Sequence, residues 1–170
     1  MRRGQWLALG GFVLAVAVVA VVGSLASAAG VDGWYADAAK PPWTPPNWLF
    51  GPVWTVLYLG MALAAWLVWR SGEPGRRARP GRRRALSVYW AQLVLNALWT
   101  PVFFAAYPTW GPAALWVAAG IMLALLVAVA YCLVAFWRIS RVAGAIMVAY
   151  LAWLLYASTL NLGVALLNPA

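Results

Sequence analysis

Amide and aromatic side chains recur at helical spacing within three otherwise apolar stretches of the sequence. Gln92, Asn96 and Trp99 stand at i, i+4 and i+7, which places them on one face of a helix. Two further stripes of this kind are Trp54 with Tyr58, and Tyr150 with Trp153, Ala157 and Asn161. Such side chains either join helices through hydrogen bonds or bind a planar ligand by stacking and hydrogen bonding, and the spacing leaves both interpretations open.

A segment rich in aromatic residues and proline, at residues 29–47, separates the first two apolar stretches. An aromatic belt at the membrane interface explains rings such as Trp34 and Trp48, because tryptophan prefers the headgroup level. It does not explain the paired prolines, which fix the backbone and hence the directions of the rings. We therefore predict a rigid lid over one end of a helix bundle, and its principal residues are Trp34, Lys40, Trp43, Pro45 and Pro46.

The titratable residues exclude several kinds of chemistry. Histidine is absent, Cys132 is the only cysteine, and the only acids are Asp32, Asp37 and Glu73. This inventory excludes a Ser-His-Asp or Cys-His triad, a zinc site, a disulfide framework and axial histidine ligation of haem. We expect no metal site and no required cofactor.

The composition indicates which elements must position these side chains. Of the 170 residues, 66% are hydrophobic and 9% are charged, whereas an ordinary soluble domain has roughly 25% charged residues. Five membrane-spanning helices of about 22 residues each would account for the apolar residues. The sequence predicts an all-α membrane protein, a single-domain bundle of five transmembrane helices, with spans at about 6–28, 48–69, 86–106, 113–136 and 142–167.

Basic residues predict the orientation of this bundle. The net charge is +9, and a hydrophilic loop at 70–85 holds seven of the twelve basic residues. The N-terminus, this loop and the turn at 138–141 fall on one face, so the positive-inside rule predicts a cytoplasmic N-terminus and an external C-terminus. Since no aromatic rings interleave with the arginines of the loop, we expect contact with membrane lipid and not with nucleic acid.

The first apolar stretch has an alternative interpretation. A basic start and the sequence Ala26-Ser27-Ala28 are also typical of a cleavable signal peptide. The apolar run is longer than a usual signal core, and its removal would leave four spans and reverse the charge asymmetry. We therefore predict a helix that is retained.

Four motifs, in order along the chain, carry a resemblance to a known family. They read Trp34-Tyr35-x4-Lys40-Pro41-x-Trp43-x-Pro45-Pro46-x-Trp48, Gly51-Pro52-Val53-Trp54, Gln92-Leu93-x-Leu95-Asn96-x2-Trp99-x-Pro101-x-Phe103-Phe104 and Tyr150-Leu151-Ala152-Trp153-x3-Ala157-x-Thr159-Leu160-Asn161. Over this length the sequence resembles the translocator protein family, also called tryptophan-rich sensory proteins (TspO/MBR).

The resemblance implies a five-helix bundle with a pocket between helices under the first loop, commonly assembled as a homodimer, here in a bacterial plasma membrane. Family members bind porphyrins, so it also implies a membrane receptor or sensor whose ligand is a tetrapyrrole (protoporphyrin IX or haem), or another planar or lipidic molecule. The motifs place Trp54 and Trp153 among the pocket positions, and the helical stripe adds Tyr58. The other implied ligand-binding residues are Tyr35, Gln92, Asn96, Trp99 and Ala157.

Two other functions are compatible with the same residues. One is an enzyme that degrades porphyrin in light, with Trp54 and Trp153 as candidate catalytic residues. The other is a tetrapyrrole transporter, although no acidic residue lies inside a predicted span to couple transport to protons. The sterol motif of animal members has Tyr and Arg near the end of the last helix; residues 160–167 contain neither, which puts sterol binding in doubt.

Overall fold

The computed structural model describes residues 3–72 and 80–169. All the secondary-structure elements of these residues are helices. Five helices are long and apolar enough to cross a membrane. This confirms the predicted all-α class and an integral multi-pass membrane protein. The elements are α1 (Arg3–Val31), α2 (Trp34–Asp37), η1 (Asn47–Leu49), α3 (Phe50–Arg70), α4 (Arg82–Thr100), η2 (Pro101–Ala105), α5 (Tyr107–Trp110), α6 (Pro112–Ile139) and α7 (Arg141–Leu167).

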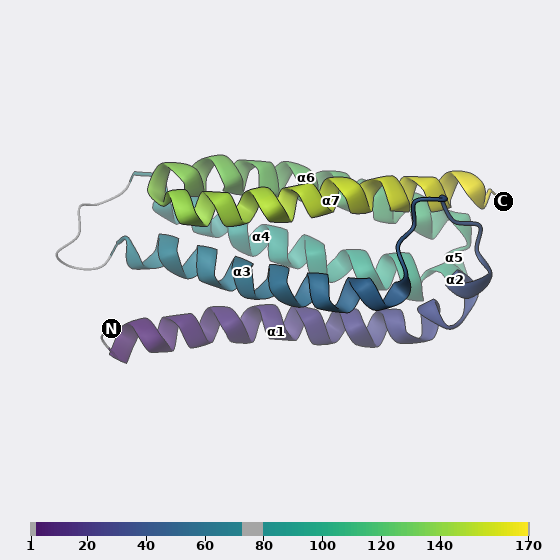
Figure 1. The fold of residues 1–170 in the computed structure, drawn as a ribbon, viewed down its shortest axis with the longest axis horizontal. Helices are drawn as coiled ribbons and strands as arrows, with labels where there is room; N and C mark the ends of the chain where they lie inside the picture. Colours follow the sequence, from purple (N-terminus) through teal and green to yellow (C-terminus); the bar gives the residue numbers. More distant parts are fainter. Residues whose placement is uncertain (1–2, 73–79, 170) are drawn as a thin grey trace.

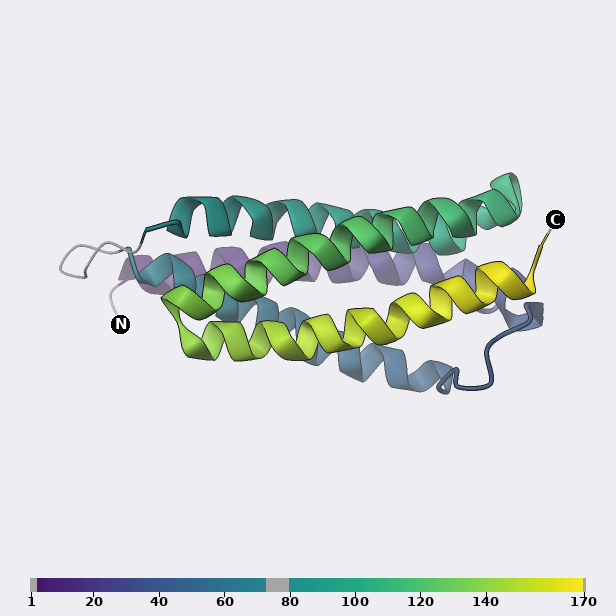
Figure 2. The same ribbon diagram turned by 90° about the horizontal axis from the view of Figure 1, so that it is seen from above.

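The five long helices run along the long axis of the molecule (Figure 1), and their contacts close a ring. Going around the bundle, α1 packs on α3, α3 on α7, α7 on α6, α6 on α4, and α4 on α1. Figure 2 shows the long helices running side by side, with the two chain ends at opposite ends of the bundle. The order in space therefore differs from the order in sequence, and residues of α3, α4 and α7 can meet in the interior.

The tightest pairing joins α6 and α7 through a short turn. Ser140 begins α7, and its hydroxyl accepts a hydrogen bond from the Ala143 backbone N–H at 3.3 Å. Gly144 then lies against α6, where a Cβ atom would come within 2.8 Å of the Trp137 Cα atom. Since the Trp137 backbone could not give way to a larger residue, glycine permits this close approach of the two helices.

Burial divides the helices into a tightly packed group and one peripheral member. Ten residues of α7 and eight of α6 are buried, but α1 buries only Phe12, Val16 and Gly30 although it is the longest helix. An apolar helix with so few buried residues is stable only with lipid around it. Helix α1 is thus the least buried helix of the ring, and its loose packing leaves space between it and the other helices.

The long helices lie over the five predicted spans and differ from them mainly at their ends. The first helix continues to Val31, and the predicted lid segment contains a helical turn, α2. The basic loop is shorter than predicted, because Arg82, Arg83 and Arg84 already belong to the first turn of α4. The remaining loop arginines at 76, 77 and 79 lie outside the described residues.

Charged residues of the described chain are divided between the two ends of the bundle. Arg3, the end of α3, the start of α4 and the α6–α7 turn bring their arginines to one end, while Asp32, Asp37 and Lys40 lie at the other. Arg70 lies over the Trp66 ring at 4.6 Å from its centroid, and Arg84 lies 5.5 Å from that of Tyr131. Such an end is suited to anionic headgroups.

We predict that the arginine-rich end is cytoplasmic. Single cysteines placed at the exposed positions Arg83 and Ala39 (R83C and A39C) should be labelled from opposite sides of the membrane, Ala39→Cys from outside intact cells and Arg83→Cys only after permeabilisation. The native Cys132 is buried, so the wild-type protein should not be labelled and serves as the negative control. Labelling of both cysteines from outside would contradict this topology.

Candidate ligand-binding site

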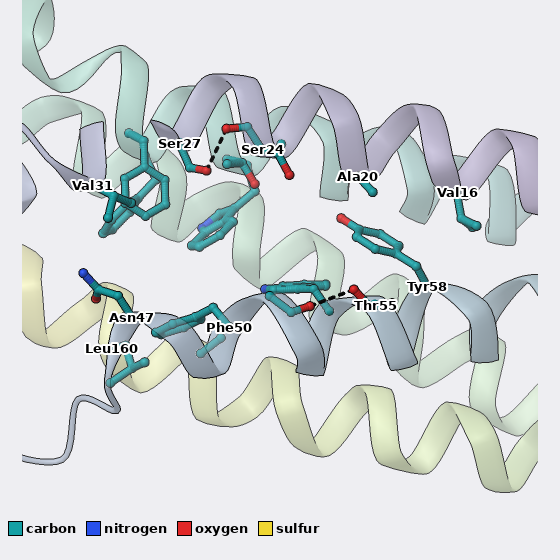
Figure 3. A pocket seen from close by; sticks show the side chains of 18 of the residues that line it. Val16, Ala20, Ser24, Ser27, Val31, Asn47, Phe50, Thr55, Tyr58 and Leu160 are labelled. Carbon is teal, nitrogen blue, oxygen red and sulfur yellow. Dashed lines mark hydrogen bonds between the residues drawn. The ribbon is translucent and has the colours of Figure 1, made fainter. Parts of the chain in front are cut away.

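A cavity of about 560 Å³ lies inside the bundle at the end that carries α2 and η1. Its walls come from α1, α3, α7 and the junction of α4 with η2, and Figure 3 shows side chains of α1 and α3 facing each other across it. Its volume falls within the range of about 300–1,000 Å³ that is typical of small-molecule sites. The described structure therefore contains a pocket of ligand size, below the predicted lid.

Five of the predicted ligand-binding residues line this cavity. They come from four different elements and are Tyr35, Trp54, Tyr58, Trp99 and Ala157. Of the others, Gln92 and Asn96 are buried between helices and Trp153 lies behind the wall, so none of the three lines the cavity. Their predicted roles in binding stay untested.

A bend in the third span turns aromatic rings toward the cavity. Pro101 has no N–H to donate to the carbonyl of Ala97, and the chain widens here into the π-helical turn η2. This turn closes with a 3.0 Å hydrogen bond from the Ala106 N–H to the Pro101 carbonyl. The bend places Phe103 and Phe104 in the lining.

Asn96 is the centre of a hydrogen-bond network that joins three helices. The Tyr58 hydroxyl of α3 donates to Asn96 Oδ1 at 2.8 Å, and Asn96 Nδ2 donates to the Tyr150 hydroxyl of α7 at 3.0 Å. Tyr150 in turn donates to Gln92 Oε1 at 3.1 Å, and Gln92 Nε2 contacts Met61 Sδ at 3.8 Å. The structure thus favours the helix-joining interpretation of both amides. Of the network, only Tyr58 reaches the cavity.

The side-chain amide of Asn161 fixes the orientation of Trp99. The indole Nε1 of Trp99 donates to Asn161 Oδ1 at 2.9 Å, and Asn161 Nδ2 donates to the Leu115 carbonyl at 3.1 Å. The Trp99 ring stacks on Phe103 with centroids 5.3 Å apart. Because its N–H is already bonded, Trp99 offers a ligand its ring face and not a donor.

Trp54 differs from Trp99 in having a free N–H. Its ring stacks on Tyr58 with centroids 5.3 Å apart and meets Tyr150 edge-on at 6.4 Å. Trp54 Nε1 makes no hydrogen bond to a described residue. A donor without a partner in an apolar cavity is a strong anchor for an acceptor atom on a ligand.

The segment between α1 and α3, residues 32–49, covers the cavity at this end of the bundle, and we call it the roof. Tyr35 in α2 is its principal contact with the cavity. The residue is buried, and Lys40 Nζ lies 4.8 Å from the centroid of its ring. Burial raises the pKa of the Tyr35 hydroxyl, so this group remains a neutral donor at physiological pH. The roof therefore contributes the neutral phenol of Tyr35, with the Lys40 ammonium against its ring.

Trp153 occupies a different place from the one its helical stripe predicts. It packs edge-on against Phe50, which itself lines the cavity, with ring centroids 5.8 Å apart. Its Nε1 atom is buried without a hydrogen-bond partner in the described structure. Position along α7 explains the difference, because Ala157, Leu160 and Asn161 share this face of the helix but lie one to two turns nearer the end of the bundle that holds the cavity.

The predicted lid residues pack over the bundle end without lining the cavity. Trp34 Nε1 donates to the Phe104 carbonyl at 2.9 Å, and its ring stacks on Tyr107 at 3.8 Å. Trp43 Nε1 donates to Thr159 Oγ1 at 3.2 Å. The other three are Lys40, which donates to the Ala36 carbonyl at 3.0 Å, and Pro45 and Pro46, which lead into η1.

Reasoning from the sequence missed all the cavity-lining residues of α1. The helix contributes Val13, Val16, Ala17, Ala20, Gly23, Ser24, Ser27 and Val31. Their spacing of three or four residues and their small or hydroxylated side chains were the available signal. Among the described residues no group of three His, Cys, Asp or Glu could hold a metal ion.

Removal of the shared bonds of Asn96 should destabilise the bundle. We expect Asn96→Leu and Tyr150→Phe each to lower the free energy of unfolding by about 1–3 kcal/mol, because each leaves buried partners unsatisfied. The double variant should lose less than the sum, with a coupling of about 0.6–1.7 kcal/mol, as for buried polar pairs in membranes. Unfolding in mild detergent micelles measures this cycle, and strict additivity would show that the two residues do not interact.

Comparison with known proteins agrees with this geometry. The chain matches the model of the TspO/MBR family over residues 12–167. It is 36% identical to the tryptophan-rich protein TspO of Archaeoglobus fulgidus, over 92% of this chain and 94% of that protein, and 36% identical to the human translocator protein, over 92% and 87%. Identity to the tryptophan-rich sensory protein of Cereibacter sphaeroides is 37%, over 81% and 78%. The chain therefore belongs to the TspO/MBR family.

Proposed function

We propose that this protein is a membrane receptor or sensor that binds a tetrapyrrole, protoporphyrin IX or haem, in the cavity between α1, α3 and α7. The sensor role is supported by relatives that are named as sensory and translocator proteins. The tetrapyrrole is the ligand class that the family resemblance of the sequence implies. The same cavity would accept other planar or lipidic molecules of similar size.

The observation that carries this proposal is the chemistry of the cavity lining. The aromatic residues Trp54, Tyr58, Trp99, Phe103 and Phe104 line the space, and no described lining residue carries a charge. A porphyrin has two apolar faces that stack on such rings. Its polar atoms need a few donors, which the Trp54 N–H and the Tyr35 hydroxyl supply.

The carboxylates of a porphyrin need a place outside the apolar part of the cavity. A charge buried there without a partner would cost several kcal/mol. The roof offers the Lys40 ammonium next to the Tyr35 ring, and Asn47 at the start of η1 is exposed at the cavity edge. We infer that the carboxylate edge faces the roof and the ring lies deeper, above Tyr58.

The alternative functions receive less support from the same geometry. A light-dependent porphyrin-degrading enzyme with two redox-active indoles needs Trp54 and Trp153 beside the ligand, but only Trp54 lines the cavity. A proton-coupled transporter needs a titratable acid inside the membrane, and all three acids of the sequence lie outside the five spans. Binding without turnover is therefore the function we propose.

Filling the cavity should abolish binding of the proposed ligand. Ala157 is buried in the lining, so Ala157→Phe should weaken protoporphyrin IX binding at least tenfold in an absorption titration, an effect of about 1.4 kcal/mol or more. Ala152→Phe adds the same bulk to the exposed face of α7 and serves as the matched control. Equal affinities of the two variants would show that porphyrin binds elsewhere.

The two tryptophans should separate binding from photochemistry. Trp54→Phe keeps a ring but removes the unpartnered donor, and we expect a several-fold weaker affinity for protoporphyrin IX, since one hydrogen bond contributes about 0.5–1.5 kcal/mol. Trp153→Phe should change the affinity less than twofold. If porphyrin absorbance declines under light in the wild type and this loss requires Trp153, the enzyme function would replace the receptor function.

A further inference from the structure

The cavity is closed on most of its sides. Lining residues from η2, α7 and the roof are almost inaccessible: Phe103 is 3% exposed, Ala157 5% and Tyr35 5%. In the deeper part of the cavity, Tyr58 extends from α3 toward Ala20 of α1 (Figure 3). A ligand cannot pass through these walls without disrupting the packed core.

The side between α1 and α3 is different, because lining residues there are also exposed on the outside of the bundle. On α3 these residues are Gly51, Thr55 and Leu59, at spacings of four along one edge, and Leu59 is 56% exposed. On α1 they are Val13, Ala17 and Ser24. The two edges face each other and form the rims of an opening, which we call the α1–α3 portal.

The position of the portal within the membrane follows from the length of the span. The second membrane-spanning segment runs Asn47–Arg70, so Leu59 lies close to its midpoint. The α3 rim from Gly51 to Leu59 covers about 12 Å at 1.5 Å per residue. The portal thus faces the acyl chains of the leaflet on the lid side, within a hydrocarbon core of about 30 Å.

Helix α1 is held in the bundle at a small number of points. Near its start, Trp66 Nε1 donates to the Gln5 carbonyl at 3.0 Å, and Phe12 packs edge-on against Tyr89. Near its end, Gly30 lies so close to Phe104 that a Cβ atom would come within 2.9 Å of the Phe104 Cβ. Between these attachments only Val16 is buried, and Gly23 lies against Thr100. This stretch can therefore bend with the loss of fewer contacts than the other long helices.

The roof, in contrast, is fastened at several points. The Asn168 side chain accepts from the Ala39 N–H at 3.0 Å and donates to the Ala39 carbonyl at 2.9 Å. Tyr156 donates to the Trp43 carbonyl at 2.8 Å, and Pro41 lies against Gly163. Opening the cavity from the aqueous side would break these bonds together with those of Trp34.

We propose that the ligand enters and leaves sideways, from the bilayer, through the α1–α3 portal. This inference rests on the proposed function, because it presupposes that the cavity binds a ligand. It specifies the ligand class further: a molecule that partitions into the membrane and reaches the protein through the acyl-chain region. The roof bonds stay intact during exchange.

Rate measurements with protoporphyrin IX in vesicles test the portal. A bulky ring beside either rim, Val21→Trp or Val56→Trp, should slow association and dissociation by about tenfold each, equivalent to about 1.4 kcal/mol of barrier. Val21 follows Ala17 by one helical turn and Val56 adjoins Thr55, and both are exposed and outside the lining. The dissociation constant should therefore change less than threefold, because a narrowed passage raises the barrier in both directions. Leu59→Ala widens the rim and should accelerate both rates.

Two control variants separate the portal from the roof. Val18→Trp places the same ring on the exposed lipid face of α1, outside the lining, and should leave both rates unchanged. Asn168→Ala releases one roof attachment and should likewise have wild-type rates. Wild-type rates in both rim variants, or faster exchange in Asn168→Ala alone, would overturn the portal. No binding by the wild type would overturn the proposed function, and the portal with it.

Discussion

The amide of Asn96 is bonded on both sides, to Tyr58 of α3 and to Tyr150 of α7. In a bilayer no water replaces these bonds, so helices that separate here leave polar groups in hydrocarbon at a cost of several kcal/mol. The bonds fix the rotation of α3 and α7 about their axes. Rotation in turn decides that Trp54, Tyr58 and Ala157 line the cavity.

The cavity exists because one helix is packed less tightly than the other four. The buried residues of α3, α4, α6 and α7 form a continuous core that also holds Tyr89 and Cys132. Helix α1 adds only Phe12 and Val16 to this core and makes further contacts at Gln5 and Gly30. A soluble protein would lose stability by leaving such a helix exposed, but lipid covers it here without penalty. The membrane therefore permits an internal space with an apolar wall on one side.

The thirteen tryptophans of the sequence serve different physical purposes. Several are exposed near the ends of the long helices, as expected for an aromatic belt: Trp6, Trp48, Trp110, Trp116 and Trp137. Trp66, Trp34 and Trp99 donate to acceptors in other elements and hold the bundle together. Trp54 alone among the lining indoles keeps an unpartnered N–H in the cavity. The composition shows that tryptophan is abundant, but the role of each tryptophan depends on whether a hydrogen-bond acceptor lies near its N–H.

The sequence by itself determined the fold class and the family, because both depend on local properties. Span length and hydropathy are read along the chain, and backbone hydrogen bonds within each segment are obligatory in lipid. The same spacing could not decide whether Gln92 and Asn96 join helices or meet a ligand, since a stripe shows which residues share a face and not what that face contacts. Only the tertiary structure shows that both amides bond to side chains of neighbouring helices, that Trp153 lies outside the cavity lining and that α1 lines the cavity. The physical reason is that helix order and rotation are set by packing and hydrogen bonds between segments far apart in the chain.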